Sequence, residues 1–251
     1  MTAVYTPSSV QPVVVGSEPL TFQDVVAVAR GGARIGLDPA ALERVQTSRT
    51  RIEALANDVE PHYGISTGFG ALATTFIAPE ARAQLQRSLV RSHAAGSGPE
   101  VETEVVRALM LLRLSTLMTG RTGVRPETAQ AYANLINAHL TPVVHEYGSL
   151  GCSGDLAPLS HCALVLMGEG RVRDREGVQR PTLAALSEAG LEPVVLSEKE
   201  GLALINGTDG MLGQLVLALD SLQTLFATAD IAAAMSVEGL LGSDAVFADD
   251  L

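Results

Sequence analysis

One long apolar stretch near the end of the chain limits the folds that this sequence can adopt. From Met211 to Leu241 the residues are mostly apolar, and three acidic side chains interrupt the run, at Asp220, Asp230 and Glu238. Acidic residues at such intervals, with no basic residues flanking them, argue against a membrane span. An apolar helix of this length needs partners on several sides. The stretch therefore predicts the start of a bundle of long helices.

The composition of the 251 residues also favours helices. Hydrophobic residues make up 47% of the chain, aromatic residues only 4%, and there is no Trp, which suits Ala-, Leu- and Val-rich helices better than an aromatic-rich sheet. Capping residues and prolines predict further helices at about residues 21–34, 39–57, 79–95, 99–118 and 126–140. A capping box at Ser197 and Glu200 predicts the start of one more short helix. The fold class is all-α, with one short hairpin expected in the polar stretch 170–182.

The charge and the cysteine content exclude several classes of function. The formal net charge of −11 would repel nucleic acid and anionic membranes, so we expect neither as a partner. Two cysteines, Cys152 and Cys162, are too few for a disulfide framework, and no metal site is expected. No secretory signal is apparent at the N-terminus, which makes the cytoplasm the expected location.

The segment from Gly148 to His161 contains the residues most suited to unusual chemistry, Cys152-Ser153-Gly154. In a tight turn, the Gly154 amide nitrogen can attack the carbonyl of Cys152 and close a five-membered ring, because glycine has no side chain to obstruct the attack. Loss of water from that ring and from the Ser153 hydroxyl would leave a methylidene-imidazolone, an electrophile made from the backbone. By itself, the segment favours an ordinary buried helix capped by Ser153 or Asp155.

Two distant segments accompany this one, HYGISTGFG at residues 62–70 and LALINGTDG at residues 202–210. Together the three resemble the aromatic amino acid ammonia-lyases, in which the central tripeptide becomes the methylidene-imidazolone prosthetic group and no external cofactor is used. The resemblance runs from about Thr21 to the last residue. Cys152 departs from the alanine that is more common there, although only its backbone carbonyl would enter the ring.

The resemblance implies a fold and an organisation. It implies the mainly helical N-terminal part of the fumarase/aspartase-like fold, with an extended arm at 1–19, a helical domain at 20–200 that carries the prosthetic-group loop, and the start of the central bundle at 201–251. Members of the family are homotetramers about twice as long as this chain. We therefore expect a truncated form or N-terminal half, which lacks an Arg and a second Tyr of the family's active site and whose own activity is doubtful.

Site residues follow from the matched motifs. Tyr63 corresponds to the family's catalytic loop tyrosine, and Gly70 of the same segment is implied in substrate binding. Ser92 and His93 correspond to the positions beside the substrate side chain, and this pair is similar to that of members acting on histidine. Asn206 would lie beside the prosthetic group.

The expected reaction removes ammonia from L-histidine and gives urocanate. The electrophile would capture the substrate through its amine or its ring, Tyr63 would act as the general base, and Asp155 would polarise the turn during cyclisation or simply cap a helix. Two alternatives stay open. One is a tyrosine or phenylalanine lyase, or an aminomutase, of the same architecture. The other is an inactive, self-associating helical fragment with uncyclised Cys152-Ser153-Gly154.

Overall fold

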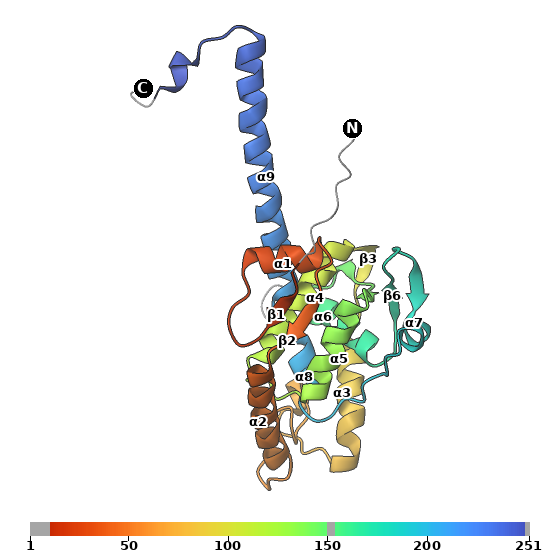
Figure 1. The fold of residues 1–251 in the computed structure, drawn as a ribbon. Coiled ribbons are helices and arrows are strands. Elements are labelled where there is room, and N and C mark those ends of the chain that lie inside the picture. Colours follow the sequence, from red (N-terminus) through yellow and green to blue (C-terminus); the bar gives the residue numbers. More distant parts are fainter. Residues whose placement is uncertain (1–10, 150–153, 249–251) are drawn as a thin grey trace.

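The computed structural model of the chain, which describes residues 11–149 and 154–248, is a body of packed helices from which one long helix projects (Figure 1). The α-helices are α1 (Phe22–Ala29), α2 (Pro39–Ala56), α3 (Pro79–His93), α4 (Thr103–Met118), α5 (Pro126–Asn137), α6 (Leu156–Leu166), α7 (Thr182–Glu188), α8 (Glu200–Ile205) and α9 (Asp209–Gly239). The strands are β1 (Val13–Val15), β2 (Ile35–Leu37), β3 (Ser97–Glu100), β4 (Thr141–Pro142), β5 (His145–Tyr147), β6 (Arg171–Arg173) and β7 (Gln179–Pro181). Short 3-10 turns occur at Gly70–Leu72 and Asp244–Phe247. The expected helical class is confirmed.

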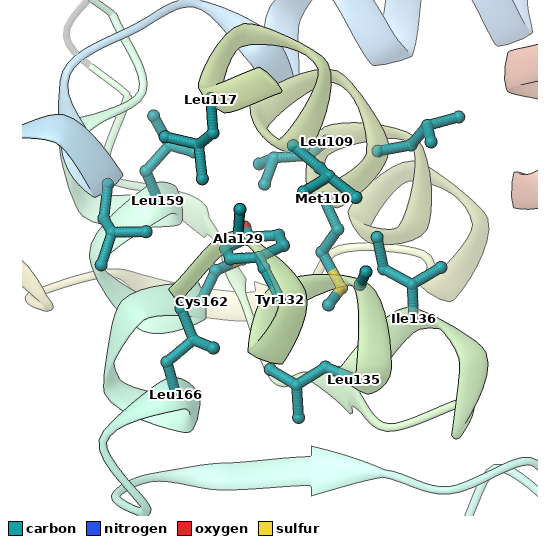
Figure 2. Packing of buried hydrophobic residues seen from close by; sticks show 14 of the residues in the cluster. Leu109, Met110, Leu117, Ala129, Tyr132, Leu135, Ile136, Leu159, Cys162 and Leu166 are labelled. Atoms are coloured by element: carbon teal, nitrogen blue, oxygen red, sulfur yellow. The ribbon is translucent and has the colours of Figure 1, made fainter. Parts of the chain in front are cut away.

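Helix α4 lies at the centre of the body and packs against α1, α2, α5, α8 and α9. Figure 2 shows how its apolar side chains meet those of α5 and α6 around the ring of Tyr132. Tyr132 is fully buried, and the neighbouring Cys162 on α6 is buried as well. Burial raises the pKa of the Cys162 thiol to about 12. Cys162 is therefore a packing residue and not a reactive thiolate.

The N-terminal stretch is partly built into this body. Within residues 11–19 of the expected arm, β1 pairs in parallel with β2, and Val13 and Val15 are buried. Helix α1 begins with the predicted capping box of Thr21 and Asp24. It ends at Ala29 and not near residue 34, because Gly32 has a φ of +65° that turns the chain toward β2.

Two other helix starts show what local signals can and cannot predict. Helix α2 begins as expected at Pro39, with the Asp38 carboxylate accepting from the Ala40 and Ala41 amides. Helix α4 begins at Thr103, four residues later than expected, because Ser97–Glu100 pairs with β5 as an antiparallel strand. The short hairpin expected at 170–182 is confirmed as β6 and β7, to which β4 adds a third strand.

The capping box expected at Ser197 is only half formed. The Ser197 amide donates to the Glu200 carboxylate at 2.8 Å, but α8 begins at Glu200 itself, after Lys199 in a left-handed conformation with φ +72°. The Glu200 side chain is fully buried and has further partners at the start of α5, in its N-cap residue and first turn. It accepts from the Arg125 amide at 3.0 Å, from the Arg125 guanidinium at 2.7 Å and from the Thr128 hydroxyl at 2.5 Å. Tertiary partners thus take the place of the local cap.

Replacing Glu200 tests this buried network. Glu200→Gln removes the charge but keeps the shape, and we expect it to lower the free energy of unfolding by about 2–4 kcal/mol, because Arg125 loses its counter-charge. Urea denaturation measures the change. Glu188→Gln is the matched control, since Glu188 pairs with Arg180 at the surface and should cost less than about 1 kcal/mol. If both variants lost the same free energy of unfolding, Glu200 would not be the centre of a stabilising buried network.

Helix α9 has 31 residues, and its buried residues all lie in the first third, between Asp209 and Leu217. Beyond Leu217 it extends away from the other helices (Figure 1). Among the described residues it is the one helix long and apolar enough to cross a membrane, a test that the core helices of soluble proteins also pass. Its Asp220 carboxylate pairs with Arg30, which also pairs with Glu104 on α4, so the helix leaves the body at an ionic contact.

Candidate active site

The last residue of the tripeptide is held against the turn between α8 and α9. Gly154 forms a parallel β-bridge with Gly207, and the next amide, that of Asp155, donates to the Gly207 carbonyl at 2.9 Å. The Ser149 hydroxyl donates to the Gly154 carbonyl at 3.3 Å. Cys152 and Ser153 lie outside the described residues. The segments around 148–161 and 202–210, far apart in sequence, therefore lie side by side as predicted.

Only glycine fits at position 154. Its φ is +76°, a conformation that L side chains rarely adopt. A Cβ at this position would lie 2.9 Å from both the Met211 methyl group and the Thr208 methyl group. The backbone nitrogen that would close the ring therefore belongs to a residue packed closely against Thr208 and Met211.

Asp155 does not cap the helix that follows it. It is the N-cap residue of α6, but its side chain makes no capping hydrogen bond to that helix, so the simple local cap was a wrong prediction. Instead its buried carboxylate accepts from the Gly210 amide at 2.8 Å and the Met211 amide at 3.1 Å. These amides belong to the first turn of α9, where a negative charge is favourable. Asp155 therefore caps a helix that begins 54 residues later in the chain.

Arg113 of α4, which the sequence reasoning missed, holds the other side of this turn. Its buried guanidinium donates to the carbonyls of Ala203 and Asn206, both at 3.0 Å, and pairs with the carboxylate of Asp209. The backbone of Asn206 is thus fixed at the end of α8, while its side chain is exposed. A signal for this role exists, since Arg113 is a charged residue among leucines in the middle of an apolar helix.

Gly207 offers a direct test of the turn. A Cβ there would lie 1.9 Å from the Arg113 Nη2 and 2.5 Å from the Asp209 Oδ2 atom. We expect Gly207→Ala to lower the free energy of unfolding by about 1–3 kcal/mol through overpacking, as measured by urea denaturation. Gly36→Ala is the control, since a Cβ at Gly36 meets nothing within 4 Å. A neutral Gly207→Ala would show that the turn is looser than the structure indicates.

Tyr63 belongs to a compact loop that rests on α8. The His62 carbonyl accepts from the amides of Ile65, Ser66 and Thr67, which closes the loop on itself. A Cβ on Gly64 would meet Leu202 of α8 at 3.2 Å, so the loop and that helix are in close contact. The Tyr63 ring is half-exposed and meets the Phe69 ring edge to face, with centroids 6.1 Å apart.

Ser92 and His93 end α3, and their hydrogen bonds fix the tautomer of the histidine. His93 Nδ1 lies 2.9 Å from the Leu89 carbonyl and 3.1 Å from the Ser92 hydroxyl, which itself lies 2.9 Å from the same carbonyl. Because a carbonyl only accepts, Nδ1 must carry the proton. In the tautomer with the proton on Nδ1, Nε2 is a hydrogen-bond acceptor.

Helices α3, α6 and α8 pack against one another, which brings their matched motifs to one region. The Gly96 amide, just after α3, donates to His161 Nε2 on α6 at 3.2 Å. Burial and the neighbouring His145 ring, 5.7 Å away between centroids, lower the pKa of His161, which keeps it an acceptor. At Gly70, a Cβ would meet nothing within 4 Å, so this position is open.

Comparison with known proteins agrees with the three motifs. Residues 20–251 match the sequence profile of the family described as aromatic amino acid lyase. The chain belongs to the aromatic amino acid lyase family.

Several relatives in this family are close. Histidine ammonia-lyase of Streptomyces avermitilis is 63% identical over 95% of this chain and 47% of its own length. Tyrosine 2,3-aminomutase of Myxococcus fulvus is 47% identical over 85% of this chain and 41% of its own length. The crystal structure of the ergothioneine-degrading enzyme ergothionase from Treponema denticola superimposes with a TM-score of 0.89, at 29% identity, over 95% of this chain and 48% of that one. The chain spans about half the length of the relatives that it matches.

The residues present fit the prosthetic group that lyases of this family form autocatalytically from their own backbone. The tripeptide ends in a glycine that the structure requires, and this glycine is anchored on both sides, by Ser149 and by Gly207. An exposed Asn206 adjoins that anchor. When formed, the group supplies an electrophile that no ordinary side chain provides.

Proposed function

We propose that the protein catalyses the elimination of ammonia from L-histidine to give urocanate. The observation that carries the proposal is the contact between Gly154 and the Asn206-Gly207 turn, because it brings two matched motifs together around the expected electrophile. The names of the relatives at 62–63% identity support the choice of substrate. We further propose that Cys152-Ser153-Gly154 cyclises to methylidene-imidazolone, without any external cofactor, and that the protein works in the cytoplasm.

The reaction poses a problem of proton selection. The β-proton of histidine is far less acidic than the ammonium group beside it, so a base alone would remove the wrong proton. Tyr63 is the group proposed to take the β-proton, since its half-exposed phenol lies on a loop fixed to α8. Asn206 would bond to the substrate or to the ring through its exposed amide, while Arg113 holds its backbone.

His93 is proposed to select the substrate. With Nδ1 protonated and bonded to the Leu89 carbonyl, its Nε2 can accept the N–H of a substrate imidazole. A phenyl ring offers no such donor, and a binding group left without its partner costs affinity. Ser92 supports this tautomer, and Gly70 remains a proposed substrate contact.

A second function within the family has specific support from the tyrosine 2,3-aminomutase relative at 47% identity. A tyrosine or phenylalanine lyase, or an aminomutase, would use the same electrophile on a different substrate. A third possibility is a catalytically inactive helical chain in which the tripeptide stays uncyclised.

The intact mass and a peptide map across residues 148–161 form the first test. A deficit of two molecules of water is expected in the native chain and should be absent in Ser153→Ala, which cannot form the methylidene group. Tyr63→Phe should retain the mass deficit, whereas its rate of urocanate formation should fall about 100-fold or more. Product formed from tyrosine and not from histidine would support the aminomutase or tyrosine lyase. An unmodified mass in the native chain would support the third possibility, an inactive chain with an uncyclised tripeptide.

We also propose that the protein assembles as a homotetramer through α9. Beyond Leu217 this helix exposes large apolar side chains along its length, and uncovered surfaces of this kind mark protein contacts. The exposed residues include Leu222, Leu225, Phe226, Ile231 and Met235.

The molar mass of the protein, measured by light scattering after size-exclusion chromatography, tests the assembly. Leu225→Asp should shift the native tetramer toward smaller species, because it places a charge in the proposed contact. Leu183→Asp is the matched control, because Leu183 on α7 is 60% exposed and Leu225 is 59% exposed. A monomeric native chain, or an equal shift in both variants, would refute assembly through α9.

A further inference from the structure

A polar cavity of about 280 Å³ lies between the end of α1, the start of α4 and the turn that joins β6 to β7. It shares no lining residue with the candidate active site. Four of its lining residues carry cationic or titratable nitrogen groups, and they come from different parts of the chain: Arg30, Arg107, His139 and Arg175. The cavity is not used in the proposed reaction.

Arg107 has an uncompensated charge in this cavity. Its side chain is only 5% exposed, and its guanidinium donates to two carbonyls, those of Val28 at 2.9 Å and Ile136 at 3.3 Å. No carboxylate of the described ranges pairs with it. Burial lowers the pKa of Arg107, which reflects the cost of keeping a cation there. A counter-charge from a bound ligand would remove that cost.

His139 stands beside Arg107 in a strained backbone conformation. Its φ is +54°, which costs a non-glycine residue about 1 kcal/mol or more. The ring approaches the chain at Gly32, where a Cβ would lie 3.2 Å from the His139 Cε1 atom. Burial lowers the pKa of His139, and so do the nearby positive charges of Arg107, Arg175 and Arg34, against the opposing charge of Glu176.

The other charged groups that line the cavity are already paired. Arg30 bonds to Glu104 and Asp220. The Asp174 carboxylate accepts from the amides of Glu176 and Val178 in its own turn, at 3.2 and 2.8 Å, and its second oxygen lies 4.0 Å from Arg180. The cavity therefore keeps an excess of positive charge, in a chain whose net charge is −11.

The start of α4 also borders the cavity, and Glu104 of its first turn is paired with Arg30. Thr103 lines the cavity and is the first residue of the helix, and the N-cap residue Glu102 makes no side-chain hydrogen bond to the first turn. The amides of a first helical turn lack partners within the helix, and the helix dipole places partial positive charge there. This is the end of a helix at which anions bind.

We propose that this cavity is a binding site for a compact tetrahedral oxyanion, either inorganic sulfate or phosphate or the terminal phosphate of a small molecule. Its donors would be Arg107, Arg175 and a protonated His139. Because these donors come from α4, from the β6–β7 turn and from the segment after α5, a ligand with oxygens in several directions suits them better than a planar carboxylate. The site is independent of the proposed ammonia-lyase activity.

Calorimetric titration of the native chain with sulfate, at constant ionic strength, tests the proposal. Saturable 1:1 binding is expected, and Arg175→Gln should weaken it about tenfold or more, because a charge-assisted hydrogen bond is lost. Arg175 is exposed in a turn, so the variant should fold. Arg171→Gln is the matched control, an exposed arginine of the same hairpin that does not line the cavity, and should change the affinity less than about twofold.

The pH dependence separates a specific site from general attraction. Sulfate keeps its charge between pH 5.5 and 7.5, so tighter binding at pH 5.5, by severalfold, would report proton uptake by the protein. His139→Asn should abolish that increase, since asparagine tolerates a positive φ but takes up no proton. A phosphate monoester that binds more tightly than sulfate would identify the phosphate source. Absence of saturable binding, equal weakening by Arg171→Gln, or acetate that binds as tightly as sulfate would overturn the proposal.

Discussion

The guanidinium of Arg113 is the single group on which the arrangement around Gly154 depends. It lies where the carbonyl end of α8 meets the acidic start of α9, and it neutralises both through bonds to Ala203, Asn206 and Asp209. Without a cation, two carbonyls and a carboxylate would be buried together without a counter-charge. The turn between these helices has only three residues, so fixing its ends also fixes Gly207. Gly207 in turn holds the backbone of Gly154 and Asp155.

Helix α4 carries this arginine and also Arg107, six residues earlier. Six residues turn a helix by about 240°, so the two side chains leave it on different faces. Arg113 reaches the ends of α8 and α9, whereas Arg107 reaches α1 and α5 and lines the polar cavity. One central helix therefore carries two separate buried charges, one paired with a carboxylate and one bonded only to carbonyls. Because Arg113 already has a carboxylate partner, its role is structural, whereas Arg107 has none among the described residues and is a candidate binding group.

Signals that act over a few residues allowed much of the fold to be predicted. The capping box at Thr21, the Asp38-Pro39 start of α2 and the hairpin at 170–182 all appear where the sequence places them. The early end of α1 has a local cause in Gly32, whereas the other errors share a partner distant in sequence. Helix α4 begins late because β3 pairs with β5 more than 40 residues away. Arg113 and the true partner of Asp155 were missed for the same reason. The placement of Asn206 near the tripeptide was predicted from matched motifs, whereas the bridge between Gly154 and Gly207 required the structure.

The cap that Asp155 places on α9 has a consequence for the order in which the chain matures. Helices form in about a microsecond, whereas contacts between residues distant in sequence form later, because the intervening chain must first be ordered. The backbone just after Cys152-Ser153 therefore reaches its final position only once the first turn of α9 has docked beneath it. Any chemistry that needs a compressed turn at this place waits for that docking. On the proposed cyclisation, a chain that stalls earlier in folding would keep an ordinary serine, so the reactive group would arise only in molecules whose surrounding helices are already packed.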